Sequence, residues 1–166
     1  FESLEDRAVP AIFDITSGVA SDLIAAINTA NTNGDPTNTI NLTGTYTLNE
    51  IDNYWYGPTG LPAITSNLSI IGNSSTPTSI ERDTSPSTPN FRLFFVGGGQ
   101  SGASYGTLSL LNLTLAGGVA KGGDSSTGGG GLGAGGAIFS QGTVNLLDVT
   151  ITNNQAIGGS SGVGGL

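Results

Sequence analysis

The chain has 166 residues, including 28 glycines but no cysteine or histidine, and its 12 acidic and 4 basic residues give a formal net charge of −8. Without Cys or His, disulfides, thiol chemistry, the usual serine or cysteine triads and imidazole metal ligands are excluded. Clustered Lys and Arg, which a nucleic-acid partner requires, are also missing. No apolar run reaches the ~20 residues that span a bilayer, so we expect no membrane insertion.

The N-terminal part of the chain predicts an extended arm followed by a cap. Residues 1–12 are rich in charge and are expected to be extended. A helix is expected to begin at Ser21 and to end before Asn33. We expect the cap, residues 13–39, to use the apolar face of this helix to cover the first open layer of strands. That face carries Leu23, Ile24, Ile27 and Ala30.

Short segments that alternate apolar and polar residues predict strands along most of the chain. The expected strands are residues 11–16, 39–43, 45–48, 63–64, 67–71, 91–96, 107–116, 137–139 and 143–152. Residues 49–62 and 72–90 are expected to be loops, and the acidic and basic residues Glu81, Arg82 and Asp83 are interpreted as a solvated part of the second loop. Residues 117–136 predict a glycine-rich insertion.

Two of these strands are copies of one pattern. The segment TLSLLNLTLA at residues 107–116 aligns without a gap on TVNLLDVTIT at residues 143–152, an offset of 36 (143 minus 107). A shorter copy, LSIIG at residues 68–72, aligns on LSLLN at residues 108–112, an offset of 40 (108 minus 68). Repeats of this length that carry one strand each indicate stacked units in which every strand pairs with the next copy.

This pattern predicts an all-β fold, a parallel β-helix or solenoid with a short N-terminal capping α-helix. A single domain is expected over residues 1–166, with rungs in residues 40–157 and a glycine-rich tail in residues 158–166. Asp148 occupies the position of Asn112 in the repeat, which favours a corner residue over a catalyst. The expected inward positions are Leu108, Leu110, Leu113 and Leu115, stacked near Val144, Leu146, Val149 and Ile151.

Several motifs resemble a known group of proteins. The segments at residues 21–31, 38–42, 44–48, 60–65, 79–83 and 91–94 are similar to the N-terminal region of bacterial CSLREA-type surface proteins. The segments GGAIF at residues 135–139 and NNQA at residues 153–156 resemble repeats of polymorphic outer-membrane proteins. The resemblance implies a right-handed parallel β-helix and an exported protein of the extracellular space or cell surface, of the kind often presumed to be an adhesin.

The candidate ligand-binding residues are Tyr54, Trp55 and Tyr56, because exposed aromatic faces stack on sugar rings. The alternative is that these rings close a gap in the fold. No catalytic residue, cofactor or metal is expected. The carboxylates are scattered along the sequence, although stacked strands leave open that two of them face each other across a sugar. Residues 128–136 lack the context of a dinucleotide site, and Asp124 alone does not make a calcium site.

We therefore predict an exported structural or surface protein, a segment or subunit of an extracellular filament, matrix or adhesin. The alternatives are a polysaccharide-binding module and a carbohydrate-active enzyme. The tail after Thr152 lacks the bulk to cover an open strand layer. Self-association by end-to-end stacking or by strand addition is therefore expected, with the arm at residues 1–12 as a candidate complementing strand. Because the chain begins at Phe1 and contains no Met, it is interpreted as a piece of a longer product.

Overall fold

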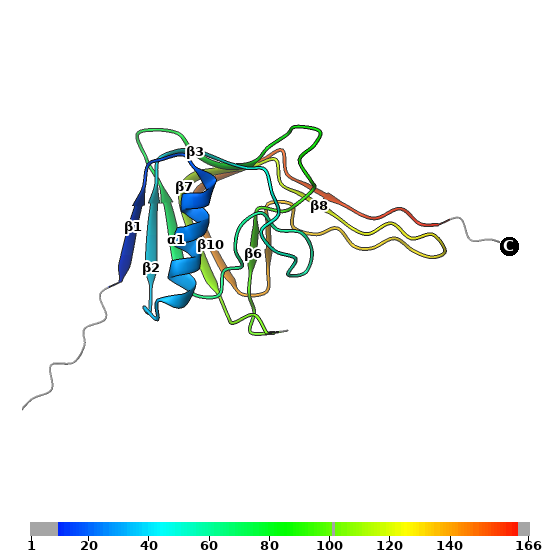
Figure 1. Ribbon diagram of the computed structural model, residues 1–166, viewed down its shortest axis with the longest axis horizontal. Coiled ribbons are helices and arrows are strands. Elements are labelled where there is room, and N and C mark those ends of the chain that lie inside the picture. The colour runs from blue at the N-terminus through cyan, green and yellow to red at the C-terminus, as the bar shows by residue number, and fades with distance from the viewer. Residues whose placement is uncertain (1–9, 101, 163–166) are drawn as a thin grey trace, which may run out of the picture.

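The structure is a computed structural model that describes residues 10–100 and 102–162 (Figure 1). Residues 1–9, most of the expected N-terminal arm, and residues 163–166 of the expected tail lie outside the described part. The described elements are β1 (Ala11–Ile15), α1 (Ala20–Thr32), β2 (Asn38–Leu42), β3 (Gly44–Leu48), β4 (Asn67–Gly72), β5 (Thr78–Arg82), β6 (Phe94–Val96), β7 (Thr107–Ala116), β8 (Val119–Lys121), β9 (Ile138–Ser140), β10 (Thr143–Thr152) and β11 (Gln155–Ile157).

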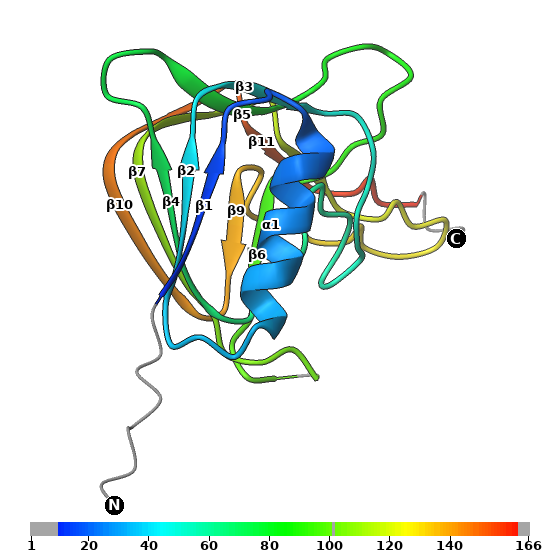
Figure 2. The same cartoon turned by 60° about the vertical axis from the view of Figure 1, so that its left-hand side comes forward.

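The largest unit is a seven-stranded sheet whose strand pairs are all parallel. Strands β1, β2, β4, β7 and β10 lie side by side in that order, as Figure 2 shows. The long strand β7 pairs with β4 through its first half and with β5 through its second half, and β3 continues from β5. Between the two halves Asn112 adopts a φ of 54°, in the left-handed region, so β7 turns there.

The sequence repeat is confirmed as a parallel, in-register strand pair. Strand β10 pairs with β7 so that Thr143 faces Thr107 and Thr152 faces Ala116. Leu108, Leu110, Leu113 and Leu115 are all buried, as expected for inward positions. Asp148 has a φ of 53°, matching Asn112 at the equivalent position, which confirms the expected corner. The alternation of apolar and polar residues therefore set the register as well as the strands.

The expectation of an all-β, right-handed parallel β-helix with a capping helix is wrong. The described strands form one seven-stranded sheet and two separate two-stranded sheets, β6 with β9 and β8 with β11, and they do not close into a solenoid. Residues 49–66, which carry Pro58 and Pro62, form no strand and contribute only isolated bridges, such as Thr59 to Arg92 and Ile64 to Val96. The fold is better described as a mostly parallel sheet with flanking strands and one helix.

Helix α1 packs its apolar face into the core that the sheet builds. Leu23, Ala26, Ile27 and Ala30 are buried in the same cluster as the inward residues of β2, β4 and β7. Asn31 fixes the end of the helix to the irregular segment before β4, because its amide donates to the Ala63 carbonyl at 2.8 Å and accepts from the Thr65 N–H at 3.0 Å. No helix of the described residues is long and apolar enough to cross a membrane.

The expected loop at residues 72–90 contains strand β5, so the interpretation of Glu81, Arg82 and Asp83 as a solvated loop is wrong. Glu81 and Arg82 belong to β5 and all three residues are partly buried. The Arg82 side chain donates to the carbonyls of Gly117, Thr88 and Pro89 and lies over the Phe91 ring, 5.8 Å from its centroid. Only Ile80 marks the inward face of this short strand, which explains why sequence alternation missed it.

The glycine arm, residues 122–133 and 157–162, extends away from the sheet (Figure 1). Its three extended segments are joined by backbone hydrogen bonds that recur every third residue, the period of a polyproline II helix. With the segments numbered in chain order, N–H groups of the first segment donate to the third, those of the third to the second, and one of the second to the first. They are Gly122 N–H to Ile157 O, Ser125 to Ser160, Gly159 to Gly131, Gly162 to Gly128 and Gly131 to Gly123.

Candidate functional site

The aromatic loop, residues 53–57, presents the three candidate ligand-binding residues on the surface. Asn53 starts a tight turn by accepting the Trp55 N–H at 3.3 Å, and the Gly57 N–H bonds the Tyr54 carbonyl at 3.2 Å. Tyr56 has a φ of 50°, an uncommon conformation for a residue with a side chain. Tyr54 is 71% exposed, Trp55 37% and Tyr56 44%. Strained, exposed residues of this kind are common in ligand-binding loops.

The aromatic loop is anchored by two phenylalanines on the outer face of the β6–β9 sheet. Trp55 stacks on Phe95 with ring centroids 6.5 Å apart and planes 16° apart. Tyr56 tilts over both Phe95 and Phe139, at 5.5 and 5.9 Å. Trp55 and Tyr56 therefore cover Phe95, while all three rings keep exposed surface. Ligand binding by these residues stays a prediction.

Arg92 lies beneath the aromatic loop as a buried cation. Its side chain is 5% exposed and its guanidinium carbon lies 4.8 Å from the centroid of the Phe139 ring. The Nε and Nη1 atoms have no hydrogen-bond partner in the described part of the structure, and burial lowers the pKa of the guanidinium. Sequence analysis missed Arg92, Phe95 and Phe139. Strand alternation around the inward Phe94 could have assigned Phe95 to the outer face.

Two hollows adjoin at the aromatic loop, because Asn53 and Trp55 line both of them. The smaller, about 390 Å³, is formed by residues 53–56 alone. The larger, about 570 Å³, lies between the exposed side of α1 and residues 52–65. Its lining from α1 includes Asn28, Thr29 and Thr32, and Asp52 faces them from the loop. Together the two hollows combine aromatic and hydrogen-bonding side chains.

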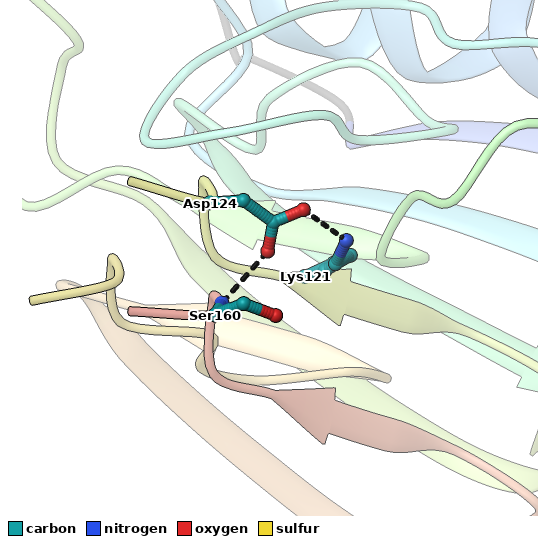
Figure 3. Close-up of polar contacts among 3 residues, drawn as sticks. All are labelled: Lys121, Asp124 and Ser160. Carbon is teal, nitrogen blue, oxygen red and sulfur yellow. Dashed lines mark hydrogen bonds and ion pairs between the residues drawn. The ribbon is translucent and has the colours of Figure 1, made fainter. Parts of the chain in front are cut away.

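Within the described residues, no group of three or more carboxylates is placed to hold a metal ion. Hydrogen bonds from Thr88 and Ser85 lower the pKa of Asp83. In the glycine arm, the Lys121 ammonium and the Ser160 N–H lower the pKa of Asp124, which accepts from them at 2.8 and 2.7 Å (Figure 3). Both carboxylates are therefore held in their ionised form by structural contacts, whereas a general acid needs a raised pKa.

Strand β10 is a second candidate site, because it forms an edge of the seven-stranded sheet. Its only partner among the described strands is β7. Leu146 is 46% exposed and Ile151 50% exposed, whereas their partners Leu110 and Leu115 are buried. The backbone groups of β10 that point away from β7 and the apolar row that continues the core are therefore both open to a further strand.

Three comparisons, with protein-family models, with curated proteins and with solved structures, found no match to the chain. The resemblance to CSLREA-type and polymorphic outer-membrane proteins therefore stays a prediction from the residues alone. Function has to be argued from the geometry of the aromatic loop and of the β10 edge.

Proposed function

We propose that this chain is a structural module of an extracellular or cell-surface assembly, and that it self-associates by adding a parallel strand to β10. The observation that carries the proposal is the uncovered apolar row of β10. A long edge strand with exposed apolar side chains is a template for pairing with another chain, and soluble proteins ordinarily block such edges with charge, proline or a covering element.

Strand β10 carries few of these protective features. Its one charged residue, Asp148, sits at the corner rather than within either paired half. On the outward face of β10, Leu147 is 62% exposed and lies beside Leu111, which in turn pairs with Ile71. An added strand would cover Leu147 on the outward face of β10. It would also cover Leu146 and Ile151 on the face that continues the core.

The occupant we propose is strand β1 of a second copy. Strand β1 forms the opposite edge of the same sheet and runs parallel to β10, so its addition keeps the direction of every strand. Its inward residues Phe13 and Ile15 would continue the apolar rows that Leu146 and its neighbours expose. Because the two edges differ, the contact is heterologous and each added copy exposes a new β10 edge, so stacking along the sheet direction repeats into a filament unless the rotation between copies closes a ring. No catalytic role is part of this proposal.

The test compares two leucine-to-lysine variants that make the same change in charge. Leu146→Lys places a cation in the exposed apolar row of β10, whereas Leu132→Lys places one at a position 87% exposed in the glycine arm. We expect the natural chain and Leu132→Lys to form assemblies that grow with concentration in light scattering and electron microscopy, and Leu146→Lys to stay monomeric. A natural chain that stays monomeric at high concentration would contradict the proposal, as would equal assembly of both variants.

A further inference from the structure

We infer that the aromatic loop and the exposed side of α1 together bind a neutral, hydroxyl-rich oligosaccharide. The two adjoining hollows form one strip that runs from Tyr54 past Trp55 to the polar side of the helix. Each hollow falls in the range of about 300–1,000 Å³ that small-ligand sites occupy. This site is separate from the β10 edge and does not depend on self-association.

The aromatic part of the strip is held in place before any ligand arrives. The Trp55 ring stacks on the buried Phe95, and Tyr56 packs against Phe95 and Phe139. The Gly57 backbone closes the turn with a φ of 113°, directly above the Arg92 guanidinium. A platform that is already rigid loses little conformational entropy on binding, which favours an aromatic surface that recognises a ligand. The apolar C–H face of a sugar ring packs on such a surface.

The helical part of the strip supplies hydrogen-bonding groups suited to sugar hydroxyls. Thr29 and Thr32 line the hollow and donate their own hydroxyl protons to backbone carbonyls of α1, so their oxygens remain as acceptors. The Asp52 carboxylate is a further acceptor, and the Asn28 amide offers both donor and acceptor atoms. Because each sugar hydroxyl is both a donor and an acceptor, a mixed set of this kind recognises hydroxyl groups well.

The charge of the strip selects against acidic sugars. The described residues that line the two hollows include one carboxylate, Asp52, and neither Lys nor Arg. Arg92, whose guanidinium lies against Gly57 of the loop, is buried. A carboxylate on the ligand would therefore meet repulsion from Asp52 without a compensating ion pair at the surface. Neutral chains of several rings, long enough to contact both hollows, are the ligand class that fits.

The experiment is calorimetric titration of the full chain with neutral hexasaccharides built on glucose, mannose or galactose, and with oligogalacturonate as the acidic probe. We expect at least one neutral chain to bind and the acidic chain not to bind. Trp55→Ala should weaken binding about tenfold or more, and Tyr54→Ala and Asn28→Ala about threefold or more each. The matched control is Tyr105→Ala, which removes an exposed tyrosine that lines neither hollow.

Folding of each variant is checked by its thermal melt. Trp55→Ala uncovers Phe95, so Tyr54→Ala and Asn28→Ala, at exposed positions, carry the test if that variant fails to fold. The inference is overturned if no neutral chain binds at millimolar concentration, or if Tyr54→Ala and Asn28→Ala both bind as the natural chain does. It is also overturned if oligogalacturonate is the chain that binds and Arg92→Met abolishes that binding.

Discussion

Two regions of this molecule hold extended segments side by side by different means. In the seven-stranded sheet, neighbouring strands bury rows of large apolar side chains such as Leu68, Leu108 and Leu110. In the glycine arm, three segments approach so closely that a methyl group on Gly122, Gly130 or Gly159 would overlap backbone atoms of the next segment. The sheet is therefore stabilised by packing of its side chains. In the arm, the glycines lack side chains, and this allows the backbones of the three segments to approach closely.

This difference has a consequence for stability. Burial of apolar area gives the sheet cooperative stability, because each inward leucine contacts strands on both sides. The arm gains only backbone hydrogen bonds, each with a small net contribution in water, and it orders glycines that lose the most conformational freedom on folding. We expect the arm to open locally while the sheet stays folded.

The largest effect is expected from shortening a buried leucine of the sheet. Leu110→Ala removes a side chain that is 1% exposed in the middle of β7, and should lower the free energy of unfolding by about 2–5 kcal/mol. Leu146→Ala makes the same change at the paired position of β10, which is 46% exposed, and should cost less than about 1 kcal/mol. Urea unfolding of dilute, monomeric protein measures the stability of both variants. Equal losses of stability would show that Leu146 is buried in the monomer and that β10 is not an exposed edge.

The second-largest loss of stability is expected in the glycine arm and should be confined to it. A methyl group at Gly159 would overlap the Gly123 backbone, whereas one at Gly129 meets no atom within 4 Å. Gly159→Ala should weaken the arm by about 1–3 kcal/mol, and Gly129→Ala should leave it intact. Hydrogen exchange at the Gly122 and Gly131 amides reports the loss, because both donate across the arm. If Gly159→Ala instead lowers the stability of the whole sheet, the two regions unfold together.

A smaller effect is expected at the corner of the sheet, where backbone conformation matters more than burial. Asn112 has a φ of 54°, which a β-branched residue tolerates poorly, so Asn112→Val should cost about 1–2 kcal/mol. Asn112→Gly serves as the control, because glycine adopts this conformation without strain. The comparison is made by urea unfolding, and equal stability of the two variants would show that the turn of β7 relaxes.

The sequence predicted the sheet far better than the rest of the molecule. Alternating leucines, isoleucines and valines carry register information, so the pairing of β7 with β10 followed directly from the repeat. Strand β5 was missed because Ile80 is its one buried apolar residue. The closed β-helix was wrong: outside the seven-stranded sheet, the described strands form only two short two-stranded sheets, and residues 49–66 contribute isolated bridges instead of a strand.

The candidate sites were predicted only in part, for a similar reason. The aromatic triplet is visible in the sequence, but its supports, Arg92 before β6, Phe95 in β6 and Phe139 in β9, have no fixed sequence spacing to it. The ordered arm was also invisible, because its every-third-residue hydrogen bonds involve backbone atoms and leave no side-chain pattern beyond glycine. A pattern of side chains in a single sequence does not report contacts between backbone segments that are distant in the chain.

The smallest effect is expected from the one ion pair of the described residues, between Lys121 and Asp124. The folded-state pKa of Asp124 lies below its ordinary value of 3.8, first because Lys121 donates to the carboxylate and then because the Ser160 N–H does. A lowered pKa means that the contacts favour the ionised form. Their support for the arm is complete above the ordinary value and is lost as the pH falls through the lower folded value.

Lys121→Met should therefore raise the pKa of Asp124 toward 3.8, and leave unchanged the pKa of Asp83, which Thr88 and Ser85 lower. Carboxyl titration by NMR measures both groups in one sample, with the Ser160 amide shift as a reporter of the contact across the arm. Both side chains are exposed, so added salt should weaken the pair in the natural chain and have little effect in Lys121→Met. An unchanged Asp124 pKa in the variant would assign the lowering to the Ser160 N–H alone, and the arm would then rely on backbone donors throughout.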